Sequence, residues 1–85
     1  MDKVYMITAT TENALRVLQR ISGIFARHRL NIQQLNVFAT ANKNISFFNI
    51  TVHGDEKTVV LVVKKLQRVV ELLDVKITNE MEIVL

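Results

Sequence analysis

The fold of this chain is decided between Thr11 and Phe38, where the sequence reads TENALRVLQRISGIFARHRLNIQQLNVF. The first half places apolar side chains three and four residues apart, which predicts an amphipathic helix from about Asn13 to His28. The second half alternates apolar and polar side chains over residues 31–40, which predicts a strand. A helix therefore leads directly into a strand, and Asn13 and Asn31 stand near its two ends.

The flanking sequence adds three more strands and one more helix. Strands are predicted at residues 4–9, at 45–53 and from Val75 onward, where apolar residues alternate with one polar lapse at Asn79: Val75, Ile77, Met81 and Ile83. Gly54 and Asp55 interrupt the third strand and offer an N-cap. An apolar stripe then predicts the second helix: Val59, Val62, Val63, Leu66, Val70 and Leu73.

The element order βαββαβ is typical of an α+β, ferredoxin-like sandwich. We expect both helices on one face of an antiparallel sheet whose strands lie in the spatial order 4-1-3-2. The last strand carries charges that discourage pairing with another chain, whereas the second strand is uncharged. We therefore expect the second strand to pair with its own copy across a twofold axis, forming a homodimer. Its expected interface residues are Gln34, Asn36 and Phe38.

The face on which the aromatic rings lie depends on the strand register. If Val4, Met6, Phe48 and Ile50 face the helices, an exposed aromatic cluster forms on the opposite face from Tyr5, Phe38 and Phe47. A shift of one residue would place these rings in the core instead. Both registers remain open from the sequence.

Composition limits the class of protein. The 85 residues predict a single domain, 1–85, and 49% apolar with 22% charged residues predicts a folded chain. The sequence contains no cysteine, which, with no basic-then-apolar leader, predicts a cytoplasmic protein without disulfides. Its longest apolar run, residues 58–63, is too short for a membrane span. The net charge of +3 is scattered, so no nucleic-acid partner is expected.

The sequence offers no constellation for bond-making chemistry. His28 and His53 have no acidic residue at metal-ligand spacing, and Ser22 and Ser46 lack the context of a nucleophile elbow. We expect no catalytic residue and no metal site, so the chain reads as a binding or regulatory module. An RNA-recognition module is a minor alternative, because residues 43–50 echo its third strand but lack the glycine and two of the aromatics.

Two residues of the first helix need an explanation. Asn13 is expected to cap the helix with its side chain, although it could instead leave the helical amides free for a small-molecule carboxylate. Gly23 costs about 1 kcal/mol relative to alanine inside a helix, so we expect a neighbouring backbone to approach it closely.

Several segments of the chain resemble the ACT domain of acetohydroxyacid synthase (acetolactate synthase) small subunits. They are Asn13 with residues 20–25, then residues 30–37, 54–57 and 66–75. The resemblance covers nearly the whole chain, and the end at Leu85 suggests the short, single-domain class. It implies a non-catalytic regulatory subunit that binds and activates the catalytic subunit in branched-chain amino acid biosynthesis. Thiamine diphosphate, magnesium and FAD are expected on that partner and none on this chain. A free-standing ACT amino-acid sensor for another enzyme is the alternative.

The resemblance also implies an effector site between two ACT domains. The family holds its effector with the loop before the first helix and the start of the second strand, which here are Asn13, Asn31 and Ile32. Members with strong feedback usually have glycine three residues after the asparagine, whereas this chain has Arg16. The guanidinium either fills the pocket or pairs with a carboxylate. We favour filling, which makes feedback by valine doubtful and leaves activation intact.

Overall fold

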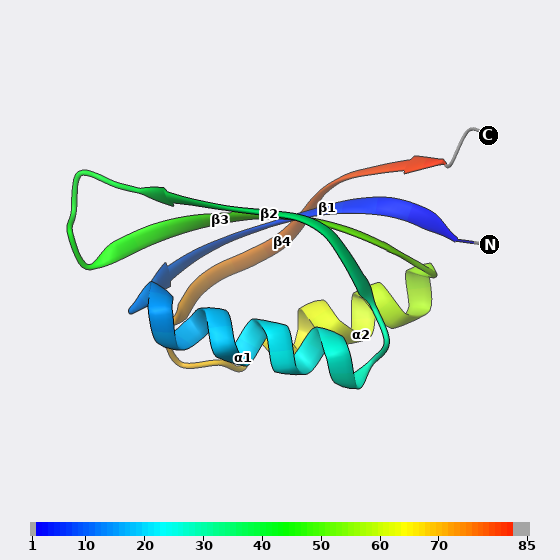
Figure 1. Cartoon of the computed structure of the whole chain (residues 1–85), viewed down its shortest axis with the longest axis horizontal. Coiled ribbons are helices and arrows are strands. Elements are labelled where there is room, and N and C mark those ends of the chain that lie inside the picture. Colours follow the sequence, from blue (N-terminus) through cyan, green and yellow to red (C-terminus); the bar gives the residue numbers. More distant parts are fainter. Residues whose placement is uncertain (1, 83–85) are drawn as a thin grey trace.

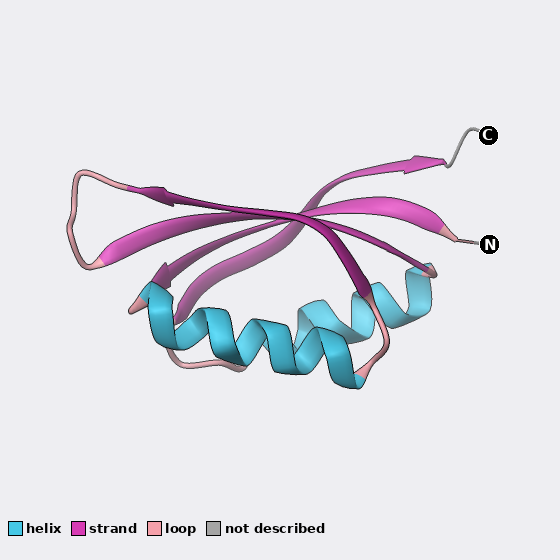
Figure 2. Cartoon of the chain, viewed as in Figure 1, coloured by secondary structure: helices cyan, strands magenta, loops and turns pink. Residues whose placement is uncertain are grey.

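Four strands and two helices form two layers in the computed structural model, which describes residues 2–82 and their side chains up to Glu80. Figure 1 shows one strongly twisted antiparallel sheet with both helices on the same face. The elements are β1 (Lys3–Glu12), α1 (Ala14–Arg27), β2 (Asn31–Ala39), β3 (Ile45–Gly54), α2 (Glu56–Leu66) and β4 (Leu72–Glu82). The strand order β2-β3-β1-β4 confirms the predicted topology. This order makes β2 and β4 the two edges of the sheet. Figure 2 shows the helices on one side of the strands.

The helix α1 forms where the apolar stripe predicted it. Val17, Ile21 and Phe25 are fully buried against the sheet. The helix ends because Arg29 adopts a left-handed backbone conformation, with φ 57°. The amide of Leu30 then donates to the carbonyl of Phe25 at 3.0 Å, and that of Arg29 to Ala26 at 3.1 Å. These two bonds form a Schellman cap, in which glycine is the usual left-handed residue.

The helix α2 begins at the predicted cap. The carboxylate of Asp55 accepts from the amide of Thr58 at 3.1 Å and from its hydroxyl at 2.7 Å. These hydrogen bonds, the hydroxyl first, lower the pKa of Asp55 below its ordinary value. The four buried residues of α2 were all predicted: Val59, Val62, Val63 and Leu66.

The predicted stripe of the second helix extends too far toward the carboxyl end. The helix stops at Leu66, Val70 is 90% exposed and Leu73 already belongs to β4. Tight turns replace the helix, since the amide of Val69 donates to the carbonyl of Leu66 three residues back. The tight turns have a different rise and rotation per residue from an α-helix, so Val69 and Leu72 are buried where Val70 and Leu73 were predicted to be.

The strand β1 turns the opposite face to the helices from the one that the exposed aromatic cluster required, in which Val4 and Met6 would face them. Tyr5 and Ile7 face the helices and are buried, opposite Val52 and Ile50 of β3. Val4 and Met6 therefore lie on the open face of the sheet. Phe48 and Ile50 face the helices as predicted. The strand is apolar on both faces, so its alternation alone did not determine which face is buried.

The polar lapse in the last strand coincides with a bulge. Ile7 pairs with Ile77, but the preceding residue of β1, Met6, pairs with Asn79, so Thr78 is the extra residue. Its hydroxyl donates to the carbonyl of Met6 at 3.2 Å. The bulge turns Asn79 to the open face, where a polar side chain is tolerated. The predicted Ile83 lies outside the described residues, as does the side chain of Met81.

Candidate functional site

The amino end of α1 is uncapped by any side chain. Asn13 has φ 50° and ψ 64°, a left-handed conformation, and its side chain makes no cap hydrogen bond. The predicted cap is therefore wrong, because a capping asparagine needs an extended backbone. The first helical bond joins the amide of Val17 to the carbonyl of Asn13, at 3.1 Å. The three preceding amides have no acceptor within the described part of the chain.

A hollow of about 520 Å³ adjoins these free amides. It lies between the start of α1 and the turn that joins β2 to β3, and its lining residues are Glu12, Asn13, Ala14, Leu15, Lys43, Asn44 and Ser46. The positive end of the helix dipole and the ammonium of Lys43 both favour an anion there. The carboxylate of Glu12 also lines the hollow and offsets the charge of Lys43, so the free helical amides are the donors that remain for a small ligand.

The predicted effector residues do not meet within one protomer. Asn13 lies at the amino end of α1, whereas Asn31 and Ile32 begin β2 just beyond the other end. Fourteen helical residues separate the two ends by about 21 Å. Asn31 is exposed, and Ile32 packs partly buried against the core. A single protomer therefore supplies only half of the expected site at each end of the helix.

Arg16 is oriented away from the hollow at Asn13. Its Nε lies 3.6 Å from Oε2 of Glu71, and its side chain is 67% exposed. The guanidinium thus pairs with a carboxylate of its own chain, and the hollow is not lined by it. Glu71 is held in turn, since its carbonyl accepts from the amide of Glu12 at 2.8 Å and from the hydroxyl of buried Thr11 at 3.0 Å. That Arg16 fills the effector pocket stays a prediction, because the pocket is expected between two copies of the chain.

The strand β2 pairs on one side only, with β3, and no other described strand covers its outer edge. Phe38, which is 51% exposed, lies on the open face beside Phe47, with ring centroids 6.5 Å apart. Asn36 is half-buried opposite Asn49, whose Oδ1 is buried without a hydrogen-bond partner among the described residues. The expected interface residues therefore lie on an available edge.

The remaining polar residues singled out from the sequence do not converge. Among the described residues, no group of three or more His, Asp or Glu side chains could hold a metal ion. His28 occupies the C-cap position of α1, and Nε2 of His53 is 3.7 Å from Oδ2 of Asp2. Of the RNA-like segment, Phe47 faces the open side but Phe48 is buried under the helices. Across residues 2–82, neither helix is long and apolar enough to cross a lipid bilayer.

The chain is similar to known proteins over most of its length. A family model described as an AHAS small subunit-like ACT domain matches residues 7–74. A probable acetolactate synthase small subunit of Archaeoglobus fulgidus is 36% identical over 76 residues, which cover 89% of this chain and 48% of that protein. The acetolactate synthase small subunit of Aquifex aeolicus is 38% identical over 71 residues, with 84% and 37% covered. The chain thus spans half or less of the length of these relatives.

Solved structures show the same fold. The acetolactate synthase small subunit from Thermotoga maritima superposes with a TM-score of 0.74 at 26% identity, covering 87% of this chain and 46% of that one. The ACT domain from GTP pyrophosphokinase of Chlorobium tepidum superposes with a TM-score of 0.75 at 18% identity, covering 91% and 99%, which supports the fold alone. Sequence, topology and the family match over residues 7–74 agree, and the chain belongs to the family of AHAS small subunit-like ACT domains.

Proposed function

We propose that this chain acts as a homodimeric regulatory subunit that binds the catalytic subunit of acetohydroxyacid synthase in the cytoplasm and raises its activity. The observation that carries the proposal is the family match over residues 7–74. The chain itself performs no chemistry in this scheme. Thiamine diphosphate, magnesium and FAD belong to the catalytic partner, and the small subunit acts through binding.

The dimer forms through β2. An open, uncharged strand edge offers unpaired backbone groups, and a twofold axis lets the same strand of a second copy satisfy them. Gln34, Asn36 and Phe38 lie at this contact, and pairing covers part of the exposed Phe38 ring. The pairing continues the sheet of one protomer into that of the next and keeps the helices of both on one face.

The same twofold axis completes the effector site. Within a protomer, α1 ends where β2 begins (Figure 1). Two copies that join antiparallel along β2 therefore place their α1 helices side by side and antiparallel as well. The amino end of one α1, with Asn13, then lies near Asn31 and Ile32 of the second copy. This arrangement explains why the residues implied by the family lie at opposite ends of one helix.

A branched-chain amino acid is the ligand that fits this composite site. Its carboxylate meets the free amides at the start of α1, and the side-chain amide of Asn13 supplies a further donor. Arg16 stands where strongly regulated relatives have glycine. Its Cβ and the first atoms of its side chain therefore leave the amino acid less room to approach the helix backbone. Since its guanidinium is directed to Glu71, replacing Arg16 by glycine should strengthen binding rather than create it.

Enzyme assays with the cognate catalytic subunit test the central proposal. Titrating the small subunit should raise acetolactate formation to a plateau, and unchanged turnover at saturating small subunit would refute it. Light scattering at micromolar concentration should give the mass of a dimer. Calorimetry with valine, leucine and isoleucine tests the effector site, and an amino acid that binds without any effect on the synthase would favour the free-standing sensor.

A further inference from the structure

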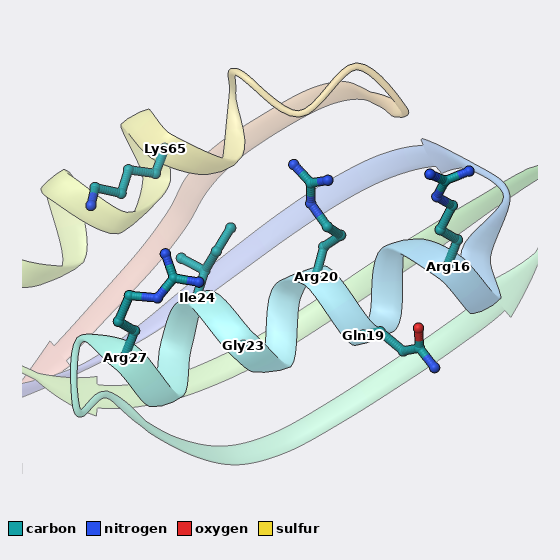
Figure 3. Close-up of a pocket in the computed structure, with 7 residues that line it drawn as sticks. All are labelled: Arg16, Gln19, Arg20, Gly23, Ile24, Arg27 and Lys65. Carbon is teal, nitrogen blue, oxygen red and sulfur yellow. The ribbon is translucent and has the colours of Figure 1, made fainter.

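A groove of about 560 Å³ runs along the junction of α1 and α2, distinct from the hollow at Asn13 (Figure 3). Its lining residues are Arg16, Gln19, Arg20, Gly23, Ile24, Arg27 and Lys65. Arg16, Arg20, Gly23 and Arg27 recur at intervals of four, three and four residues, so they form one row along the helix. In Figure 3 the three arginines project from the same side of α1, with Lys65 of α2 across from them, whereas Gln19 points away.

The groove is positively charged and largely unneutralised. Helix α1 carries three arginines and no acidic residue. Of the four cations, Arg16 alone has a carboxylate within 4.0 Å among the described side chains, that of Glu71. Arg20, Arg27 and Lys65 are exposed to solvent. An anionic partner would therefore find three cations whose charge the described chain does not offset.

Two local features of α1 weaken the isolated protomer. A Cβ added at Gly23 would meet nothing within 4 Å, so the predicted close packing at this glycine is wrong and its cost of about 1 kcal/mol gains no internal contact. Arg16 places a cation in the first turn, where the helix dipole disfavours it. Both features are explained if another molecule lies in the groove, because Gly23 lets a backbone approach and Arg16 extends the row of cations.

We infer that this groove receives an acidic helical segment of a protein partner, which under the proposed function is the catalytic subunit; to that extent the inference rests on the proposed function. From Arg16 to Arg27 the row extends about 16 Å, three turns of helix, so carboxylates three and four residues apart on a facing helix match it. The lining contains no aromatic ring on which a nucleic-acid base could stack. The groove lies on the α2 side of α1, whereas dimerisation uses the β2 edge, so both surfaces can be occupied together.

Charge reversal tests this inference. The variant R20E/R27E removes the two groove arginines that have no carboxylate partner, and K57E/K64E is its matched control. Both pairs are exposed, seven residues apart on one helix, and their second member lies in the last helical turn. Circular dichroism and thermal unfolding should show that both variants fold. A third variant, R20K/R27K, keeps the charge while removing the guanidinium fork.

Affinity for the cognate catalytic subunit is measured by interferometry in about 0.1 M salt, where the Debye length is about 10 Å. R20E/R27E should bind the catalytic subunit at least about tenfold more weakly than the wild type. The affinities of the other two variants, K57E/K64E and R20K/R27K, should lie within about threefold of the wild-type affinity. If the wild type binds the catalytic subunit and R20E/R27E binds it equally tightly, the inference is overturned while the proposed function stands. If the wild type does not bind the catalytic subunit at all, both the inference and the proposed function are refuted. Retention on single-stranded RNA that R20E/R27E alone abolishes, with subunit binding unchanged, would assign the groove to nucleic acid and also overturn it.

Discussion

Replacing Arg29 with glycine should stabilise the protein. Arg29 ends α1 with φ 57°, a conformation that costs an L-residue roughly 1–2 kcal/mol and costs glycine almost nothing. Glycine loses more backbone entropy on folding, which returns about 0.5–1 kcal/mol of that gain. The exposed Arg29 side chain makes no ion pair within 4.0 Å among the described side chains. The midpoints of these two ranges differ by about 0.75 kcal/mol, so the expected net gain is about 0.5–1 kcal/mol.

Thermal unfolding followed by circular dichroism at fixed protein concentration measures this gain. For a domain of this size, 1 kcal/mol shifts Tm by about 4–8 °C, so R29G should melt roughly 2–8 °C higher than the wild type. The control is R27G, in the last turn of α1, where glycine should instead lower the stability by about 1 kcal/mol. An unchanged or lower Tm for R29G would show that the Schellman cap depends on the arginine side chain and not on the backbone conformation.

Three further predictions concern the dimer edge, the second cap and the core. F38D should convert the dimer to a monomer in light scattering, because it places a charge on the β2 edge, while V70D, at a 90% exposed position, should leave the mass unchanged. D55A should lower Tm near neutral pH. Because the folded pKa of Asp55 lies below the ordinary 3.8, its stabilisation is present above that pH and is lost as the pH falls further, so the Tm difference from wild type should shrink in acid. Y5F should not lower the urea midpoint: the Tyr5 hydroxyl is buried without a partner among the described residues, and burial followed by the charge of Glu56 raises its pKa.

The effector role of Asn13 and Asn31 stays a prediction, and the backbone geometry of the site was not predictable from the sequence. Asn13 and Asn31 were both identified from the sequence, yet the left-handed backbone of Asn13 left no local signal, since asparagine is common both in caps and in left-handed positions. Gly23 was assigned to internal packing, although it faces open space. The row of cations is visible in the sequence at helical spacing. Whether carboxylates neutralise these cations depends on which residues the fold brings near them, so this was not visible in the sequence.

The sequence by itself determined the order of elements and the start of both helices. These features follow from short-range periods and from capping residues such as Asp55, whose energies act between neighbours in the chain. Only the tertiary structure decided that Tyr5 faces the core, that a bulge at Thr78 turns Asn79 outward, and that Gly23 faces open space. The reason is that strand register depends on pairing between distant segments, and β1, apolar on both faces, satisfies the local pattern in either register.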